Sequence, residues 1–155
     1  MPVQSATRLG YTARMINTSN PDATKERITS LLLENGIRPT QQRVQIASKL
    51  LARPQHLSAD QVLALVNQDE TRVSKATVYN TLNLFTEKGL IHQVIIDSGR
   101  VFYDSNTHMH HHIYNEDTGQ LLDIAETEVT LKNAPALPAN TVKTGVDIII
   151  RVKNR

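Results

Sequence analysis

The hydrophobic pattern of the chain changes at Gly89, and this change restricts the fold to a small set of possibilities. Before Gly89, apolar residues recur at the three- and four-residue spacing of amphipathic helices. After it, residues 90–97 and 100–103 are rich in Val, Ile, Phe and Tyr, with Ser98-Gly99 between them as a hairpin signal. Helices followed by a two-stranded hairpin predict a winged helix, in which the helix before the hairpin enters the DNA major groove.

Boundary signals divide the first half of the chain into four helices. Asn20 and Pro21 are typical of a cap and a first turn, and Gly36 is typical of the end of that helix. Ser58 and Gln61 have the spacing of a capping box. The remaining boundary signals are Pro39-Thr40, Pro54, Ser74 and Gly89.

The fourth helix, which begins after Ser74, precedes the hairpin. Val78 and Leu82 fall on its apolar face, so the other side of its first turns is expected to be exposed. A helix N-terminus favours phosphate, an amide favours adenine edges and an aromatic ring favours thymine methyls. The predicted DNA contacts are Lys75, Ala76, Thr77, Tyr79 and Asn80, with Arg43 on the second helix as a phosphate contact. The alternative is an ordinary solvated helix face.

A histidine run is the strongest chemical signal in the chain. It contains four of the six histidines, His108, His110, His111 and His112. In a strand, alternate side chains share a face, so three of these would lie together and His111 would point the other way. Asp104 and Asp123 flank the run. Because neutral imidazole is the commonest protein metal ligand, the run predicts a metal or haem site, and a solvated loop with incidental histidines is the alternative.

The chain contains no cysteine among its 155 residues, so disulfides and thiolate zinc sites are excluded. Any metal must be held by nitrogen and oxygen, a donor set that favours Fe²⁺ or Mn²⁺ and that also takes Zn²⁺ on isolation. Basic residues outnumber acidic ones up to Leu90, and the reverse holds from Ile91 onward. This asymmetry suggests a polyanion-binding module followed by a metal module, although a solvated surface would look similar.

These signals predict an α+β protein with three regions. Residues 1–20 are expected to form a flexible arm, residues 21–104 a winged-helix DNA-binding domain, and residues 105–155 a small α/β dimerisation and metal-sensing domain. Apolar runs are shorter than the roughly 20 residues of a membrane span, and the N-terminus lacks a signal-peptide pattern. We therefore expect a cytoplasmic protein without a membrane partner.

Few elements are predicted for the second domain. Two strands flank a turn at residues 115–119, a short helix covers residues 125–132, and a further strand covers residues 146–152. Such a small sheet buries little by itself and leaves an edge strand and an apolar face exposed. A homodimer with twofold symmetry would cover them.

Several motifs resemble, in order and spacing, those of the ferric uptake regulator superfamily. They are Gly36-Ile37-Arg38-Pro39-Thr40-Gln41-Gln42-Arg43, His56-Leu57-Ser58-Ala59-Asp60, Ser74-Lys75-Ala76-Thr77-Val78-Tyr79, Glu87-Lys88-Gly89-Leu90-Ile91 and the histidine run. The resemblance implies a homodimeric, metal-sensing transcription factor that binds a double-stranded DNA operator. It also implies a regulatory metal site, similar to that of the peroxide-responsive branch, at His56, Asp104, His110, His112 and Asp123.

Departures from the family pattern refine the resemblance. Most relatives hold a structural zinc with two Cys-x-x-Cys pairs, whereas Asn115 and Thr118 stand at the first pair here and the second pair is missing. No structural zinc is therefore expected. The His110-His111-His112 triplet and the C-terminal segment 146–152 look most like the iron response regulator branch, which implies haem at the triplet as a second candidate cofactor. The Cys-Pro haem motif of part of that branch is absent.

The residues and the resemblance together predict a metal-dependent repressor of iron or haem homeostasis or of the peroxide response, and not an enzyme. Two rival hypotheses use the same His/Asp cluster, a metallohydrolase and a metal-buffering protein. The sequence contains neither a His-Glu-x-x-His motif nor a Gly-rich phosphate-binding loop, which counts against the hydrolase.

Overall fold

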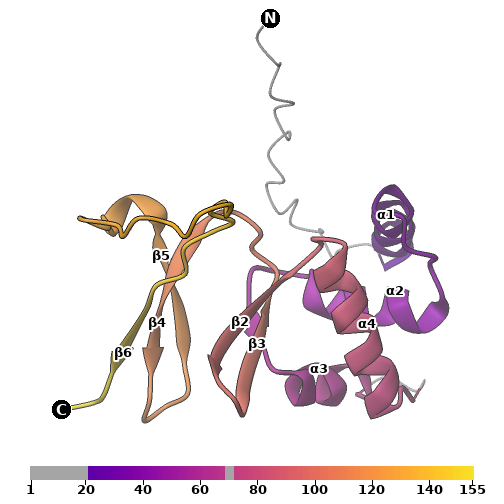
Figure 1. The fold of residues 1–155 in the computed structure, drawn as a ribbon. Coiled ribbons are helices and arrows are strands. Elements are labelled where there is room, and N and C mark those ends of the chain that lie inside the picture. The colour runs from indigo at the N-terminus through magenta and orange to yellow at the C-terminus, as the bar shows by residue number, and fades with distance from the viewer. Residues whose placement is uncertain (1–20, 69–71) are drawn as a thin grey trace, which may run out of the picture. The chain divides into compact units, whose positions relative to one another are not determined.

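The computed structural model of the chain describes residues 21–68 and 72–155 (Figure 1). The chain divides into two compact units, the first ending at Thr107 and the second running from His108 to Arg155. The arm predicted over residues 1–20 lies outside the described residues. None of the described helices is long and apolar enough to cross a bilayer.

The helices of the first unit correspond to the four predicted segments. They are α1 (Pro21–Glu34), α2 (Gln41–Leu50), α3 (Ala59–Val66) and α4 (Lys75–Glu87). Thr40, Ser58 and Ser74 cap α2, α3 and α4, because each hydroxyl accepts a hydrogen bond from the backbone N–H three residues further on. The side-chain oxygen of Gln61 in turn accepts a hydrogen bond from the backbone N–H of Ser58, so the predicted capping box is confirmed.

Two glycines end helices as predicted. Gly36 follows α1 with a φ of +69°, and Gly89 follows α4 with a φ of +71°. This left-handed conformation costs glycine little because it has no Cβ. The backbone N–H of Ile37 then donates to Leu32 O, and that of Leu90 donates to Phe85 O, which satisfies carbonyls at both helix ends.

One hydrophobic core joins the helices to the adjoining strands. It draws residues from every helix of the first unit, and its largest fully buried members are Phe85, Ile28, Leu32, Ile37, Ile46, Leu50, Leu82, Ile91, Val62, Val66 and Val78. The residues predicted to form the apolar face of α4 are among them. The opposite side of α4 is thereby left to solvent.

A three-stranded antiparallel sheet completes the first unit (Figure 1). Its strands are β1 (His56–Leu57), β2 (His92–Asp97) and β3 (Arg100–Asp104), and β3 lies in the middle. At the hairpin between β2 and β3, the backbone N–H of Gly99 donates to Asp97 Oδ1 at 2.9 Å. A hairpin that follows α4 in this way confirms the predicted winged helix.

The second unit is a smaller three-stranded sheet. Its strands are β4 (His110–Asn115), β5 (Leu121–Ala125) and β6 (Ile149–Val152), with β4 in the middle, antiparallel to β5 and parallel to β6. The turn between β4 and β5 is closed by the Asn115 side chain, whose Oδ1 accepts the N–H groups of Asp117 and Thr118 at 3.0 and 3.1 Å.

The segment between β5 and β6 differs from the prediction. The helix predicted over residues 125–132 is wrong, because only a short 3₁₀ turn, Glu126–Glu128, forms there. The β-branched Val129 and Thr130 disfavour a helix, and prolines further along the segment cannot donate helical hydrogen bonds. The strand predicted from residue 146 begins only at Ile149.

Candidate metal centre and DNA-reading helix

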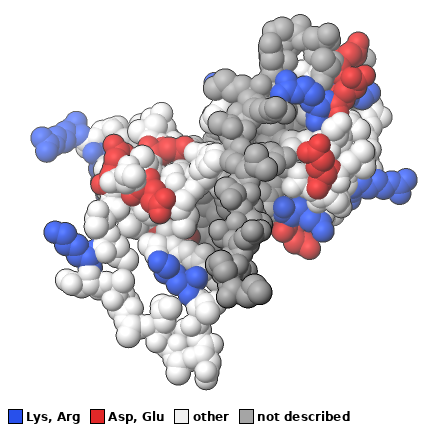
Figure 2. Space-filling view, turned by 90° about the horizontal axis from the view of Figure 1, so that it is seen from above, with Lys and Arg blue, Asp and Glu red and all other residues white. Residues whose placement is uncertain are grey.

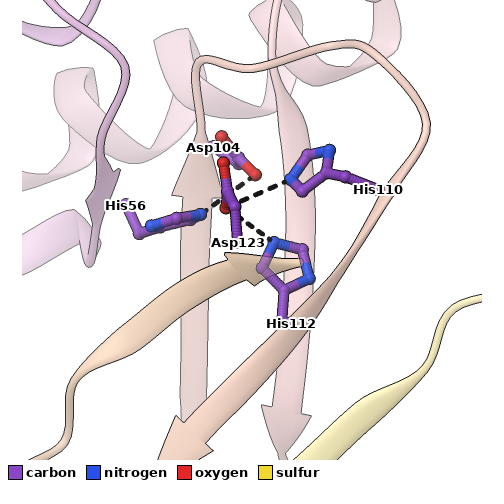
Figure 3. A group of neighbouring side chains, drawn as sticks. All are labelled: His56, Asp104, His110, His112 and Asp123. Atoms are coloured by element: carbon purple, nitrogen blue, oxygen red, sulfur yellow. Dashed lines mark ion pairs between the residues drawn. The ribbon is translucent and has the colours of Figure 1, made fainter. Parts of the chain in front are cut away.

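The first unit pairs a histidine with a carboxylate at one edge of its sheet. His56 on β1 and Asp104 on β3 are directly opposite each other in the antiparallel ladder. His56 Nε2 lies 3.2 Å from Asp104 Oδ2, and Asp104 is fully buried (Figure 3). The other carboxylate oxygen, Oδ1, accepts the backbone N–H of Asn106 at 2.7 Å. The carboxylate is therefore oriented with one oxygen toward the histidine.

The second unit contains a separate cluster of two histidines and one aspartate. His110 and His112 on β4 both direct Nε2 toward Asp123 Oδ1 on β5, at 3.4 and 3.6 Å (Figure 3). His112 and Asp123 are cross-strand partners, and the two imidazole rings meet edge to face with centroids 4.6 Å apart. Strand alternation thus places both rings on the side of the sheet that carries Asp123.

A hydrogen bond determines the tautomer of His110. Its Nδ1 lies 2.6 Å from the backbone carbonyl oxygen of His108. A carbonyl oxygen only accepts hydrogen bonds, so Nδ1 must carry a proton. In the neutral ring, the lone pair is then on Nε2, which faces Asp123. In metal sites, the ring nitrogen that does not bind the metal commonly donates such a hydrogen bond, which orients the imidazole.

His111 lies apart from this cluster. It is paired with Ile124 across the β4–β5 ladder, and alternation directs it to the opposite face from His110 and His112. His111 is buried, and its Nδ1 has no hydrogen-bond partner among the described residues. The structure therefore does not bring the three members of the triplet together on one face.

The donor spacing in each unit suits a divalent cation. Ligand atoms about 2.1 Å from an ion stand about 3.0 Å apart in octahedral geometry and about 3.4 Å apart in tetrahedral geometry. The nitrogen–oxygen separations of 3.2, 3.4 and 3.6 Å are close to these values. Imidazole nitrogens and carboxylate oxygens are donors that Mn²⁺, Fe²⁺ and Zn²⁺ accept. Both sets therefore fit a metal ion.

The N-terminal turns of α4 present the predicted DNA contacts. Lys75, Ala76, Tyr79 and Asn80 are exposed, whereas Thr77 is half-buried and its hydroxyl contacts that of Ser74 at 2.9 Å. Sequence patterns did not reveal a contact from α3, where Asp60 Oδ1 lies 3.1 Å from Lys75 Nζ. The hydrogen bond and the charge of Asp60 raise the pKa of Lys75, whose ammonium also lies 5.7 Å from the centre of the Tyr79 ring.

The remaining charges are mixed in sign. Half-buried Arg43 donates from Nη1 to the Arg38 carbonyl at 3.0 Å, so its guanidinium is held against the chain that leads into α2. Figure 2 shows blue and red side chains interspersed over the helical part of the first unit on the face that it draws. Electrostatic attraction to DNA would thus depend on particular cations more than on a uniformly basic face.

Comparison with known proteins agrees with this fold. A family model described as the ferric uptake regulator family matches residues 34–147. The peroxide-responsive repressor PerR of Staphylococcus saprophyticus is 33% identical over 99 residues, which are 64% of this chain and 66% of that protein. The chain thus matches slightly less than two thirds of that relative's length.

Two solved structures have the same fold. The ferric uptake regulator of Pseudomonas aeruginosa, determined with manganese, has a TM-score of 0.64 at 23% identity, covering 82% of this chain and 97% of its own. The ferric uptake regulator of Vibrio cholerae has a TM-score of 0.62 at 21% identity, covering 81% and 98%. The predicted fold class and the resemblance to the ferric uptake regulator superfamily are thereby confirmed. The chain belongs to the ferric uptake regulator family.

Proposed function

We propose that the protein is a metal-dependent transcriptional repressor that binds double-stranded operator DNA as a homodimer in the cytoplasm. The observation that carries the proposal is the presence, in a chain with a winged helix, of a His–Asp pair at the edge of the first sheet and a His–His–Asp cluster on the second. Family membership favours a regulator over a metallohydrolase or a metal-buffering protein.

One divalent ion, in this proposal, is shared by both sets of donors. The proposed ligands are His56, Asp104, His110, His112 and Asp123, each of which offers one nitrogen or oxygen. Five ligands leave room for a sixth in an octahedral shell, which is the geometry typical of Mn²⁺ and compatible with Fe²⁺. The absence of cysteine removes the thiolates that would select softer metals.

Sharing the ion would connect metal binding to DNA binding. A bound cation supplies positive charge that the carboxylates of both units can neutralise together. His56 and Asp104 belong to the unit that carries α4, and the other three ligands belong to the second unit. When the ion is bound, arrangements of the two units in which both sets of ligands reach it are therefore favoured. We expect a coupling free energy of about 1–3 kcal/mol, the usual range for linked sites.

Peroxide is the input signal that we favour. The relative from Staphylococcus saprophyticus is a peroxide-responsive repressor, and the ligand set here consists of nitrogen and oxygen donors. Haem at His110, His111 and His112, and membership of the iron response regulator branch, stay predictions. The buried Nδ1 of His111, which has no hydrogen-bond partner among the described residues, is the feature that keeps His111 a candidate ligand.

DNA recognition is assigned to α4. Tyr79 and Asn80 are exposed beyond the capped first turn, where they can reach base edges, and Ala76 permits close approach. The α4 N-terminus, Lys75 and Arg43 are assigned to phosphate. We keep Thr77 as a proposed contact through its backbone, because its hydroxyl is directed to Ser74.

Dimerisation is assigned to the second unit. Leu122, Ile113 and Ile150 are neighbours across β5, β4 and β6, so they form an apolar row on the face opposite the histidine cluster. Leu122 is 50% exposed and Ile150 is 43% exposed. Exposed apolar rows of this kind are typical of subunit interfaces, and a second copy would cover the row.

The proposal is tested by a gel shift. DNA bound by the protein is first selected from a random pool in the presence of Mn²⁺, and its affinity is then measured with and without the ion. We expect Mn²⁺ to strengthen binding about 5–150-fold. The double variant His110→Ala/His112→Ala should fold and dimerise but lose this response.

His108→Ala is the matched control, since it removes a histidine from the same run but keeps the carbonyl that orients His110. Equal retardation of wild-type protein in Mn²⁺ and in chelator would contradict the proposal. Metal-dependent hydrolysis in a parallel substrate screen would favour the metallohydrolase instead.

A further inference from the structure

Ser105 ties together the two chain segments that carry His56 and Asp104. Its hydroxyl donates to the carbonyl of Arg53 at 3.1 Å and accepts the backbone N–H of Gln55 at 3.1 Å. Its own backbone N–H donates to the Gln55 carbonyl at 3.3 Å. Ser105 is buried, so little water competes for these bonds. Ser105, which follows Asp104, therefore bonds both the backbone N–H and the backbone carbonyl of Gln55, which precedes His56.

We call these hydrogen bonds of Ser105 with Arg53 and Gln55 the brace. The side chain of Gln55 connects the brace to helix α2. Its side-chain Nε2 donates to the carbonyls of Lys49 and Leu50 at 2.8 and 3.0 Å. These carbonyls belong to the last turn of α2, where helical partners are lacking. Leu50 is fully buried in the core of the first unit. The brace therefore connects the His56 segment to a rigid part of the molecule.

Strand pairing alone gives His56 little support. β1 contains only two residues, and its ladder with β3 consists of the pairs His56–Asp104 and Leu57–Tyr103. So short a strand at the edge of a sheet is held weakly by its own hydrogen bonds. The hydrogen bonds of Ser105 lie immediately beyond this ladder and extend the pairing by one position. They act at the end where the histidine and the carboxylate meet.

We infer that Ser105 is a positioning residue of the metal site, which holds His56 and Asp104 at coordinating distance through the brace formed with Gln55. The inference rests on the proposed function, because it presupposes that this pair binds the ion. Ser105 itself does not ligate the metal. Its hydroxyl keeps the His56 Nε2 and Asp104 Oδ2 atoms close to their observed separation of 3.2 Å. Metal affinity depends strongly on such support.

The test compares the Ser105→Ala variant with the wild-type 155-residue chain by titration with Mn²⁺ and by the visible absorption spectrum of the Co²⁺-loaded protein. Ser105→Ala should bind Mn²⁺ about 10-fold more weakly or worse, the usual effect of losing a residue that supports ligands. Its Co²⁺ spectrum at saturation should differ from that of wild type, because the ligand geometry relaxes. Ser105→Thr keeps the hydroxyl and should restore both properties.

Ser48→Ala is the matched control. The Ser48 hydroxyl also donates to a backbone carbonyl of the first unit, that of Gln45 at 2.7 Å, but it lies on α2 rather than in the brace. We expect wild-type affinity and an unchanged Co²⁺ spectrum. Equal losses in Ser105→Ala and Ser48→Ala would overturn the inference, since they would indicate general destabilisation.

Gln55→Met provides a second route if Ser105→Ala does not fold. It removes the two hydrogen bonds to α2 and keeps the side-chain length, so weaker Mn²⁺ binding and an altered spectrum are again expected. Wild-type affinity and spectrum in whichever of these variants folds would overturn the inference while leaving the metal centre intact. Wild-type protein that binds neither ion would overturn the metal centre itself, and the inference with it.

Discussion

The two units use their apolar residues in different ways. In the first unit, large side chains from every helix are fully buried, and side-chain caps or left-handed glycines mark the helix boundaries. In the described second unit, Tyr114 is the only large side chain that is fully buried, and Leu122, Ile150 and Val152 stay 50%, 43% and 38% exposed. Small units seldom bury enough surface to be stable alone. We infer that the first unit is stabilised by its own core and the second unit by association.

The largest expected effect comes from opening the core of the first unit. Phe85→Ala should reduce the free energy of unfolding by about 3–5 kcal/mol, because the side chain is fully buried and leaves a cavity. Leu122→Ala, at a half-exposed position, should change the unfolding of the first unit by less than about 0.5 kcal/mol. Urea denaturation followed by circular dichroism measures both. Similar losses in the two variants would remove the contrast between the units.

A charged side chain in the apolar row of the second unit should weaken dimerisation rather than destabilise the first unit. Leu122→Lys is expected to raise the dimer dissociation constant at least about tenfold, because an unpaired ammonium would be buried at the interface. Val142→Lys is the matched control, since Val142 is 84% exposed and lies outside the regular strands. Sedimentation equilibrium separates the two outcomes. Unchanged association of the Leu122→Lys protein would mean that dimerisation uses another surface.

A smaller effect is expected on DNA recognition. Tyr79→Ala should weaken binding to selected DNA by about 1–3 kcal/mol while changing binding to unrelated DNA much less, because the ring is assigned to base edges. Leu33→Ala, at an exposed apolar position on α1, is the control. Fluorescence anisotropy on both DNAs gives the ratio. A loss of the same size on both sequences would make Tyr79 a contact to the DNA backbone.

The smallest expected effect concerns a single cap. Ser58→Ala should destabilise the first unit by about 1 kcal/mol, because it removes the acceptor for the Gln61 N–H. Ser58→Asp keeps an acceptor at the helix N-terminus and should retain most of the stability. Thermal unfolding of the two variants tests this. Equal melting temperatures for wild type and Ser58→Ala would show that tertiary packing alone determines where α3 begins.

Local signals account for what could be predicted from the sequence. The capping box at Ser58 and the glycines that end α1 and α4 were found because each signal acts within a few residues. The hairpin at Gly99 was found for the same reason. The helix predicted over residues 125–132 failed because the segment has no strong helix signal and the β-branched Val129 and Thr130 disfavour a helix beyond Glu128.

Distant pairings account for what could not be predicted from local patterns. His56 stands opposite Asp104 because a two-residue strand pairs with β3, and no periodicity marks so short a strand. Its proposed role as a ligand came from the family resemblance. The brace at Ser105 has no sequence signal at all, since a single serine after a strand is commonplace. Such contacts between segments far apart in sequence become visible only in the folded chain.

The proposal that donors from both units share one ion is tested most directly by the number of histidine nitrogens coupled to bound Mn²⁺. Electron spin echo envelope modulation of the Mn²⁺-loaded protein counts these nitrogens. We expect three nitrogens in the wild type, from His56, His110 and His112, and two in the His56→Ala variant. Two nitrogens in the wild type, or an unchanged count in His56→Ala, would contradict it.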